Sequence, residues 1–264
     1  MIYHIRRTAF TLAEGATHVA LLDNYRKNAF TLAEVLITLG VIGVVAAMTL
    51  PSLITKINNR GYAERLIKTY SVIQNATNKI IEEEGDPANW SWSNYQESTR
   101  VGNDNIVNLY KKNLSVAKHC VYNPWGINDD CSVKWADVKY LNGSMENVRN
   151  FCGQTVFTST YPMLLADGVY VGISFAQNAN GGGVMWGHPD IAFTIDVNGK
   201  KGPNQIGRDI FYLYMDKNSH GKVLPYTNEV SGHGAYYDFR DTCDVTKTGH
   251  SCAYRVISEG KMNY

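Results

Sequence analysis

One long apolar run, from Phe30 to Ile54, dominates the N-terminal part of the chain, and Glu34 is its only charged residue. The nearest charges on either side are Lys27 and Lys56. As a helix, at about 1.5 Å per residue, the run would extend roughly 37 Å, whereas the hydrocarbon core of a bilayer is about 30 Å thick. The pattern therefore predicts a membrane-spanning helix over 30–54.

A helical period continues beyond this run, because apolar side chains recur every three or four positions. They are Leu66, Tyr70, Ile73 and Ile80, with Thr77 as the weak position of the same face. The polar residues 58–61 are a candidate joint, and Gly85-Asp86-Pro87 predicts the end of the helix. We expect one helix over 30–84, half of it in the membrane and half packed on a head formed by 85–264.

The head changes character along its length. Residues 90–153 are loop-rich, with one helix predicted over 106–118. Later, β-branched and aromatic runs alternate with Gly, Asn and Asp turns, which predicts short antiparallel strands. The predicted strands are 168–176, 191–197, 209–215 and 222–226. The fold class is therefore α+β, with a long N-terminal helix packed on a small antiparallel sheet.

Charge at the N-terminus predicts the orientation in the membrane. Four basic residues precede the apolar run, against two acidic ones. Such a positive excess keeps the N-terminal side cytoplasmic, so the head is expected outside the cytoplasm. The basic residues are Arg6, Arg7, Arg26 and Lys27, and the acidic ones are Glu14 and Asp23.

Glu34 needs a partner, because a carboxylate on an otherwise apolar membrane helix costs a few kcal/mol. Cleavage between Ala29 and Phe30 would create an α-amino group one helical turn away from it. Within one chain this proximity satisfies the carboxylate only in part. A neighbouring helix, shifted along the membrane, would instead present its own amino terminus to Glu34 and select for assembly in register.

The segment Ala29-Phe30-Thr31-Leu32-Ala33-Glu34, followed by about twenty apolar residues and Pro51, resembles the prepilin cleavage and N-methylation motif of type IV pilins and type II secretion pseudopilins. The resemblance implies removal of 1–29 by a prepilin peptidase, cleavage between Ala29 and Phe30, and methylation of Phe30. It assigns subunit alignment to Glu34 and a helix bend to Pro51. Ala29 departs from the usual glycine, which we expect to slow cleavage at most.

The resemblance also implies location and partners. A single-pass precursor would reside in the inner, cytoplasmic membrane and then enter a periplasmic or extracellular filament. Its partners would be homologous pilin or pseudopilin subunits, the prepilin peptidase and an inner-membrane assembly platform. The sequence leaves open whether the filament is a pilus or a secretion pseudopilus.

Other interpretations of the N-terminus remain open. An ordinary signal peptide, with Val45-Ala46-Ala47 as its cleavage site, would release a secreted protein that begins at Met48. An uncleaved anchor would instead hold an exported binding module. An upstream copy of the motif, from Ala9 to Glu14, precedes a stretch that is too short and polar to span a membrane, so we assign it no role.

Five cysteines follow the apolar run: Cys120, Cys131, Cys152, Cys243 and Cys252. Their position beyond the membrane favours oxidation. The shortest loops pair Cys120 with Cys131 and Cys243 with Cys252 and leave Cys152 as a free thiol, while a bond between Cys152 and Cys131 stays open. The C-terminal pair also resembles the disulfide loop that closes many pilin domains.

Hard oxygen donors occur together on one strand connection: Asp196, Asn198 and Asp209. This turn resembles that of pseudopilin heads, and because major pseudopilins bind calcium near their sheet, the resemblance implies a calcium site at these residues. The spacing does not match an EF-hand loop, and Asx turns explain Asp and Asn equally well. We favour the structural interpretation, and the filament role requires no cofactor.

No catalytic motif stands out in the sequence, so we expect no enzyme activity. The formal charge of the whole chain is +1, which gives no electrostatic indication of nucleic-acid binding. Trp90, Trp92 and Tyr95 alternate in a polar loop, and one interpretation is that they stack on sugars. We expect them instead to pack this loop onto the helix.

Overall fold

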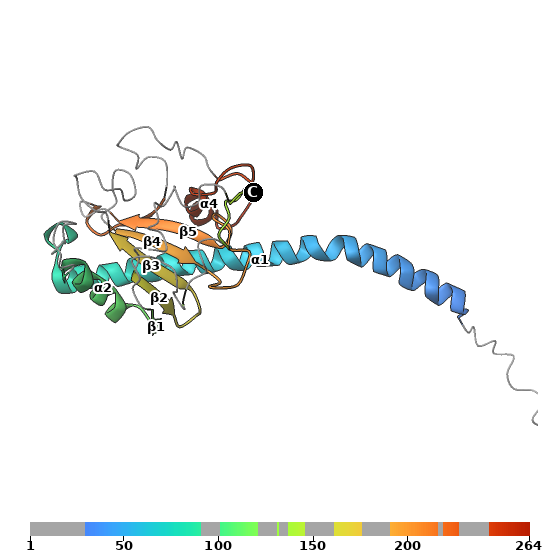
Figure 1. The fold of residues 1–264 in the computed structure, drawn as a ribbon, viewed down its shortest axis with the longest axis horizontal. Coiled ribbons are helices and arrows are strands. Elements are labelled where there is room, and N and C mark those ends of the chain that lie inside the picture. Colours follow the sequence, from blue (N-terminus) through green and yellow to red (C-terminus); the bar gives the residue numbers. More distant parts are fainter. Residues whose placement is uncertain are drawn as a thin grey trace, which may run out of the picture. The chain divides into compact units, whose positions relative to one another are not determined.

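The computed structural model describes residues 30–90, 101–120, 131, 137–145, 161–175, 191–215, 219–226 and 243–264 (Figure 1). The chain forms two compact units, Met1–Ser52 and Leu53–Tyr264. Residues 1–29, which are the predicted leader, lie outside the described residues, as do Cys152, Trp92 and Tyr95. The second half of the long helix belongs to the same unit as the head.

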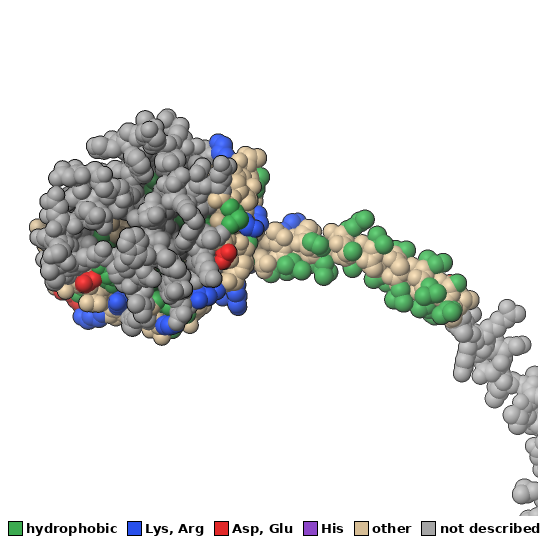
Figure 2. Space-filling view, in the orientation of Figure 1, with side chains coloured by type: hydrophobic (Ala, Val, Ile, Leu, Met, Phe, Trp, Pro, Cys, Tyr) green, Lys and Arg blue, Asp and Glu red, His purple; other side chains and the backbone are tan. Residues whose placement is uncertain are grey.

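Helix α1, Leu32–Glu84, begins in the first unit and is helical through both Pro51 and the polar residues 58–61. In the first unit its side chains are exposed, apart from a half-buried Ala46. Apolar side chains cover this part of the helix in Figure 2. By length and composition, α1 is the one helix among the described residues that can cross a membrane.

In the second unit, one face of α1 is buried against the sheet. Leu66, Ile73 and Ile80 are fully buried there, as the helical period predicts. Thr77, the weak position, is also buried, and its hydroxyl lies 2.9 Å from both the Ile73 carbonyl oxygen and the Tyr110 hydroxyl. A polar residue is tolerated on this face because its hydroxyl is hydrogen-bonded.

The sheet contains six antiparallel strands in sequence order. They are β1 Val116–His119, β2 Tyr161–Leu165, β3 Tyr170–Phe175, β4 Ile191–Asp196, β5 Ile210–Met215 and β6 Val223–Pro225. In register, Phe193 lies opposite Ile173 on one side and Leu213 on the other. These three side chains share the main core with Leu66 and Ile73 of α1.

The opposite face of the sheet is covered as well. Tyr170 and Tyr212 alternate with the core-facing residues of their strands and form a second buried cluster with Val138 and Tyr140. Two-sided burial explains why β3, β4 and β5 are buried along their whole length and show little polar alternation.

The α+β class is confirmed, but some elements differ from the prediction. The four expected strands are β3 to β6, whereas β1 and β2 were missed. From the sequence alone, Pro162 argues against a strand at this position. In the structure, however, Pro162 of β2 pairs with Gly172 of β3. The expected 106–118 helix is α2, Val101–Asn113, after which the chain enters β1.

Two further helical elements complete the described residues. The short 3-10 helix η1, Pro87–Asn89, follows α1, and α4, Cys252–Glu259, lies near the C-terminus. Helix α4 was not predicted from the sequence. It ends at Gly260, which adopts a left-handed conformation typical of helix C-termini.

Candidate functional site

The first turn of α1 is closed by reciprocal hydrogen bonds between Thr31 and Glu34. The Glu34 amide donates to Thr31 Oγ1 at 3.2 Å, while Glu34 Oε2 accepts from the Thr31 amide at 2.8 Å and from Thr31 Oγ1 at 2.9 Å. Thr31 immediately precedes the helix, and Glu34 is its third residue. The pair therefore forms a capping box, a role of Glu34 that the sequence analysis missed, although Thr-x-x-Glu signals it.

The capping box fixes where the carboxylate lies. Glu34 reaches back to the residue that follows Phe30, so an amino group released at Phe30 would lie next to the existing hydrogen bonds. The two hydrogen bonds that the Glu34 carboxylate accepts both end on Oε2. Among the described residues, no hydrogen bond reaches Oε1. One carboxylate oxygen is thus left for a donor from outside the chain's own first turn.

The helix surface around this carboxylate is apolar and exposed. The side chain of Phe30 is 84% exposed. Hydroxyl groups in the run bond to carbonyl oxygens of their own helix: Thr38 to Val35, Thr49 to Val45 and Ser52 to Thr49. Because these polar groups are satisfied internally, the segment needs only an apolar environment, which lipid or neighbouring helices can supply.

Residues 24–50 match the prokaryotic N-terminal methylation motif. The chain carries the signature of type IV pilins and pseudopilins. This motif implies processing by a prepilin peptidase and assembly with other pilin subunits, and with the apolar α1 it fits a membrane-anchored precursor. It is a structural motif and does not belong to an enzyme family. No curated protein and no solved structure matches the chain.

The sequence-predicted assembly residues lie as follows. Phe30 and Glu34 are one turn apart at the start of α1, and Pro51 lies inside the helix. Since proline lacks an N–H, the Ala47 carbonyl loses its usual helical hydrogen bond there. Ala29, on the other side of the expected cleavage site, is outside the described residues.

The loop between β4 and β5 brings together the three residues considered for calcium. Asp196 Oδ1 accepts a hydrogen bond from the Asn198 amide at 3.1 Å, which is the Asx turn of the structural interpretation. Asp209 accepts from the amides of Asn204 at 2.8 Å and Gln205 at 2.6 Å. The Asp209 carboxylate thus holds the backbone of the turn at Asn204 and Gln205.

This loop is also fastened to α1. The Asn198 side-chain amide donates to the Tyr62 hydroxyl at 3.2 Å and to the Gly202 carbonyl at 3.0 Å. Arg65 donates to the Val197 carbonyl at 2.8 Å. The orientation of the Asn198 amide is fixed, because both groups bound by its nitrogen accept hydrogen bonds.

Within the part of the chain that the structure describes, three buried oxygens of the loop have no hydrogen-bond partner: Asp196 Oδ2, Asn198 Oδ1 and Asn204 Oδ1. Asp196 is 1% exposed and Asp209 is fully buried. Burial, together with the nearby Asp209 charge, raises the pKa of Asp196 to about 8, and burial also raises the pKa of Asp209. These oxygens are of the kind a calcium ion takes, although no group of three His, Cys, Asp or Glu side chains occurs among the described residues.

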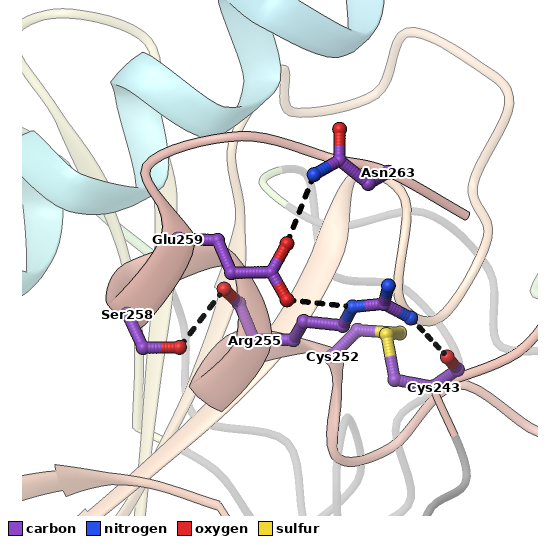
Figure 3. A network of polar contacts seen from close by, with 6 residues as sticks. All are labelled: Cys243, Cys252, Arg255, Ser258, Glu259 and Asn263. Atoms are coloured by element: carbon purple, nitrogen blue, oxygen red, sulfur yellow. Dashed lines mark hydrogen bonds and ion pairs between the residues drawn. A yellow bond between two sulfur atoms is a disulfide. The ribbon is translucent and has the colours of Figure 1, made fainter.

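Among the described residues there are two disulfides, Cys120–Cys131 and Cys243–Cys252, the pairs with the shortest loops. Figure 3 shows the C-terminal bond within a polar network. The Arg255 guanidinium donates to the Cys243 carbonyl at 3.3 Å and to Glu259 at 2.9 Å, and Glu259 accepts from Asn263 at 3.0 Å. The network holds α4 and the C-terminal residues against the disulfide loop.

Of the three aromatic residues in the polar loop, Trp90 is described. It is buried in the main core, and its indole nitrogen donates to the Gly85 carbonyl at 3.0 Å. Trp90 therefore packs the end of α1, as expected, and does not offer its ring to a ligand.

Proposed function

We propose that this protein is a structural subunit of a type IV pilus-like or type II secretion pseudopilus filament. A prepilin peptidase cleaves between Ala29 and Phe30, Phe30 is N-methylated, and the subunit polymerises through α1. The role is mechanical, not catalytic. One observation carries the proposal: residues 24–50 match the methylation motif and coincide with an exposed apolar helix that has a single carboxylate in its first turn.

The exposed helix provides the driving force for insertion and assembly. Each large apolar side chain moved out of water contributes about 1.5–3 kcal/mol. Lipid offers this environment to the precursor, and neighbouring copies of α1 offer it in a filament. Apolar contact alone does not specify register, because lipid tails and helix side chains are equally apolar.

Register comes from Glu34. In the filament, the amino group of Phe30 in one subunit pairs with the Glu34 carboxylate of another. A displacement by one helical turn, about 5.4 Å, would leave both charges unpaired in an apolar layer. Leaving one member of a buried ion pair without its partner costs about 3–5 kcal/mol, enough to select one register.

The capping box offers a competing explanation of any Glu34 phenotype, since removal of the side chain also removes a helix cap. Glu34→Gln separates the two roles, because glutamine serves in a capping box but carries no charge. Glu34→Ala removes both. Glu64→Gln is the matched control: it makes the same chemical change on an exposed part of α1, where Glu64 pairs with Arg60.

The experiment expresses the three variants with the assembly machinery and compares membrane insertion with the yield of sheared filaments. All three variants should insert. Glu34→Gln and Glu34→Ala should both reduce filament yield at least tenfold, whereas Glu64→Gln should assemble normally. Normal assembly of Glu34→Gln would reduce Glu34 to a helix cap and refute its pairing role.

Mass spectrometry of the mature N-terminus tests processing separately. The proposal requires a chain that begins at methylated Phe30. An intact leader would indicate an uncleaved anchor, and a chain that begins at Met48 would indicate an ordinary signal peptide. Either result would overturn the proposal.

A further inference from the structure

We infer that a basic collar, at the end of the head from which the apolar part of α1 emerges, binds the headgroups of anionic phospholipids in the bilayer that holds α1. The collar consists of Lys56, Arg60, Arg65, Lys200 and Lys201. The inference goes beyond the proposed filament role, because it concerns the subunit before assembly. It requires that α1 crosses a membrane, but it requires neither cleavage at Phe30 nor polymerisation.

The collar combines two segments that are far apart in the chain. Three of its residues lie on α1, shortly after the end of the apolar run at Ile54, whereas the lysine pair 200–201 belongs to the loop between β4 and β5. All five side chains are exposed and belong to the second unit. Figure 2 shows Lys and Arg side chains where α1 leaves the head. Folding therefore adds two positive charges to a stretch of helix that is already basic.

The lysine pair is held against α1 by Tyr62. The Asn198 side-chain amide donates to the Tyr62 hydroxyl at 3.2 Å, and this hydroxyl donates to the Gly202 carbonyl at 3.5 Å. Because the two lysines lie between Asn198 and Gly202, both ends of their short segment are attached to one side chain of α1. Arg65 adds a further attachment, since its guanidinium donates to the Val197 carbonyl at 2.8 Å.

The position of this attachment along α1 places the lysines within reach of lipid headgroups. Tyr62 is eight residues beyond Ile54, which corresponds to about 12 Å along the helix. The headgroup layer extends roughly 5–8 Å beyond the hydrocarbon core. The field of anionic headgroups acts over about 8 Å more at physiological ionic strength. The collar therefore lies in the region where anionic lipids attract positive charge.

Charge is segregated along α1 and the turn that follows it. Residues 56–68 contain four basic residues and one acidic residue, whereas residues 79–86 contain one basic residue and four acidic residues. About 42 Å of helix separates Lys56 from Glu84. Solubility would not require this separation, because interspersed charges serve it equally well. The basic end is the end that continues into the apolar run, as a membrane-facing surface requires.

Neighbouring acids do not neutralise the collar. Glu64 is the one acidic residue of the sequence between 53 and 68, and it pairs with Arg60 at 2.8 Å. Among the described residues, no ion pair includes Lys56 or the lysine pair 200–201. Each positive charge of this kind, close to an anionic surface, favours anionic over neutral lipid about fivefold.

Native mass spectrometry of the full-length protein in a neutral detergent measures this preference. The protein is titrated with phosphatidylglycerol or with phosphatidylcholine of the same short acyl chains, at low ionic strength and without divalent cations. We expect the wild type to bind phosphatidylglycerol at least about fiftyfold more tightly, and the preference should decrease as salt is added. In nanodiscs, phosphatidylglycerol should also slow hydrogen exchange of the amides in 198–202.

A double variant of the loop tests the contribution of the fold. Lys200→Gln/Lys201→Gln should lower the preference for phosphatidylglycerol at least about tenfold, because it removes two charges. Lys111→Gln/Lys112→Gln is the matched control: it removes two adjacent lysines from α2, where Lys112 pairs with Glu83 near the acidic end of α1. The control should retain the preference within about twofold of the wild type. Unchanged unfolding midpoints would show that both variants are folded.

Three results would overturn the inference. The first is equal binding of the two lipids by the wild type, and the second is an equal loss of preference in both double variants, which would indicate a general effect of net charge. The third is an unchanged lipid preference in the loop variant together with reduced filament yield, which would assign the collar to contact with a second subunit. An intact leader would overturn the filament proposal and leave this inference standing.

Discussion

Gly207 of the β4–β5 loop and Gly249 of the C-terminal disulfide loop lie in close contact. The variant Gly249→Ala tests this contact. Gly249 has φ of +87°, and a Cβ atom there would lie 2.6 Å from the Ile206 carbonyl oxygen and 2.7 Å from Leu141 Cβ. Gly207 faces it, with φ of +81° and a would-be Cβ 2.8 Å from the Gly249 carbonyl oxygen. Neither position has room for a side chain.

The cost of Gly249→Ala has two parts. An L-residue with positive φ costs about 1–2 kcal/mol. Overpacking against rigid neighbours adds about 1–3 kcal/mol, and here the nearest atom belongs to the backbone, so it cannot move aside as a flexible side chain would. We therefore expect a loss of about 2–5 kcal/mol in the free energy of unfolding.

Gly168→Ala provides the matched control. Gly168 has φ of +82°, but a Cβ atom there would meet nothing within 4 Å. This variant should lose only the backbone part, about 1–2 kcal/mol. The difference between the two variants isolates the steric part, about 1–3 kcal/mol.

Thermal unfolding of the two full-length variants, with disulfides intact, measures this difference. At about 2–4 °C per kcal/mol for a unit of this size, Gly249→Ala should unfold about 2–12 °C below Gly168→Ala. Equal midpoints would refute the close approach of the two loops. The double variant Gly207→Ala/Gly249→Ala should lose less than the sum of its single variants, because both clashes occur at one contact.

Two further predictions concern α1 and its C-terminal end. Tyr110→Phe should lower the free energy of unfolding by about 0.5–1.5 kcal/mol, because the Thr77 hydroxyl loses its hydrogen bond to Tyr110 but keeps the one to the Ile73 carbonyl. Urea unfolding measures this loss, and an unchanged midpoint would contradict the prediction. Hydrogen bonding to His220 lowers the pKa of Asp86, so this stabilisation is present above about pH 4 and lost as the pH falls through the lowered pKa. Asp86→Asn should therefore show a flatter decline of the unfolding midpoint below about pH 4, and an unchanged slope would count against the pairing.

The sequence alone predicted those elements that depend on local properties of the chain. Length and apolar composition predict a membrane-capable helix without any tertiary partner, and the 3.6-residue period placed Leu66, Ile73 and Ile80 on the buried face. The later strands were predictable because turns bounded them. In contrast, β1 is only four residues long, and β2 contains Pro162, so their pairing depends on neighbouring strands.

By itself, then, the sequence determined the N-terminal motif, the apolar helix with its one carboxylate and the α+β class, because each follows from composition and spacing along the chain. The tertiary structure alone decided which oxygens of the β4–β5 loop are hydrogen-bonded and which are not. It also revealed the contact between Gly207 and Gly249. Hydrogen-bond satisfaction and close approach depend on residues far apart in the chain, and spacing along a sequence does not report them.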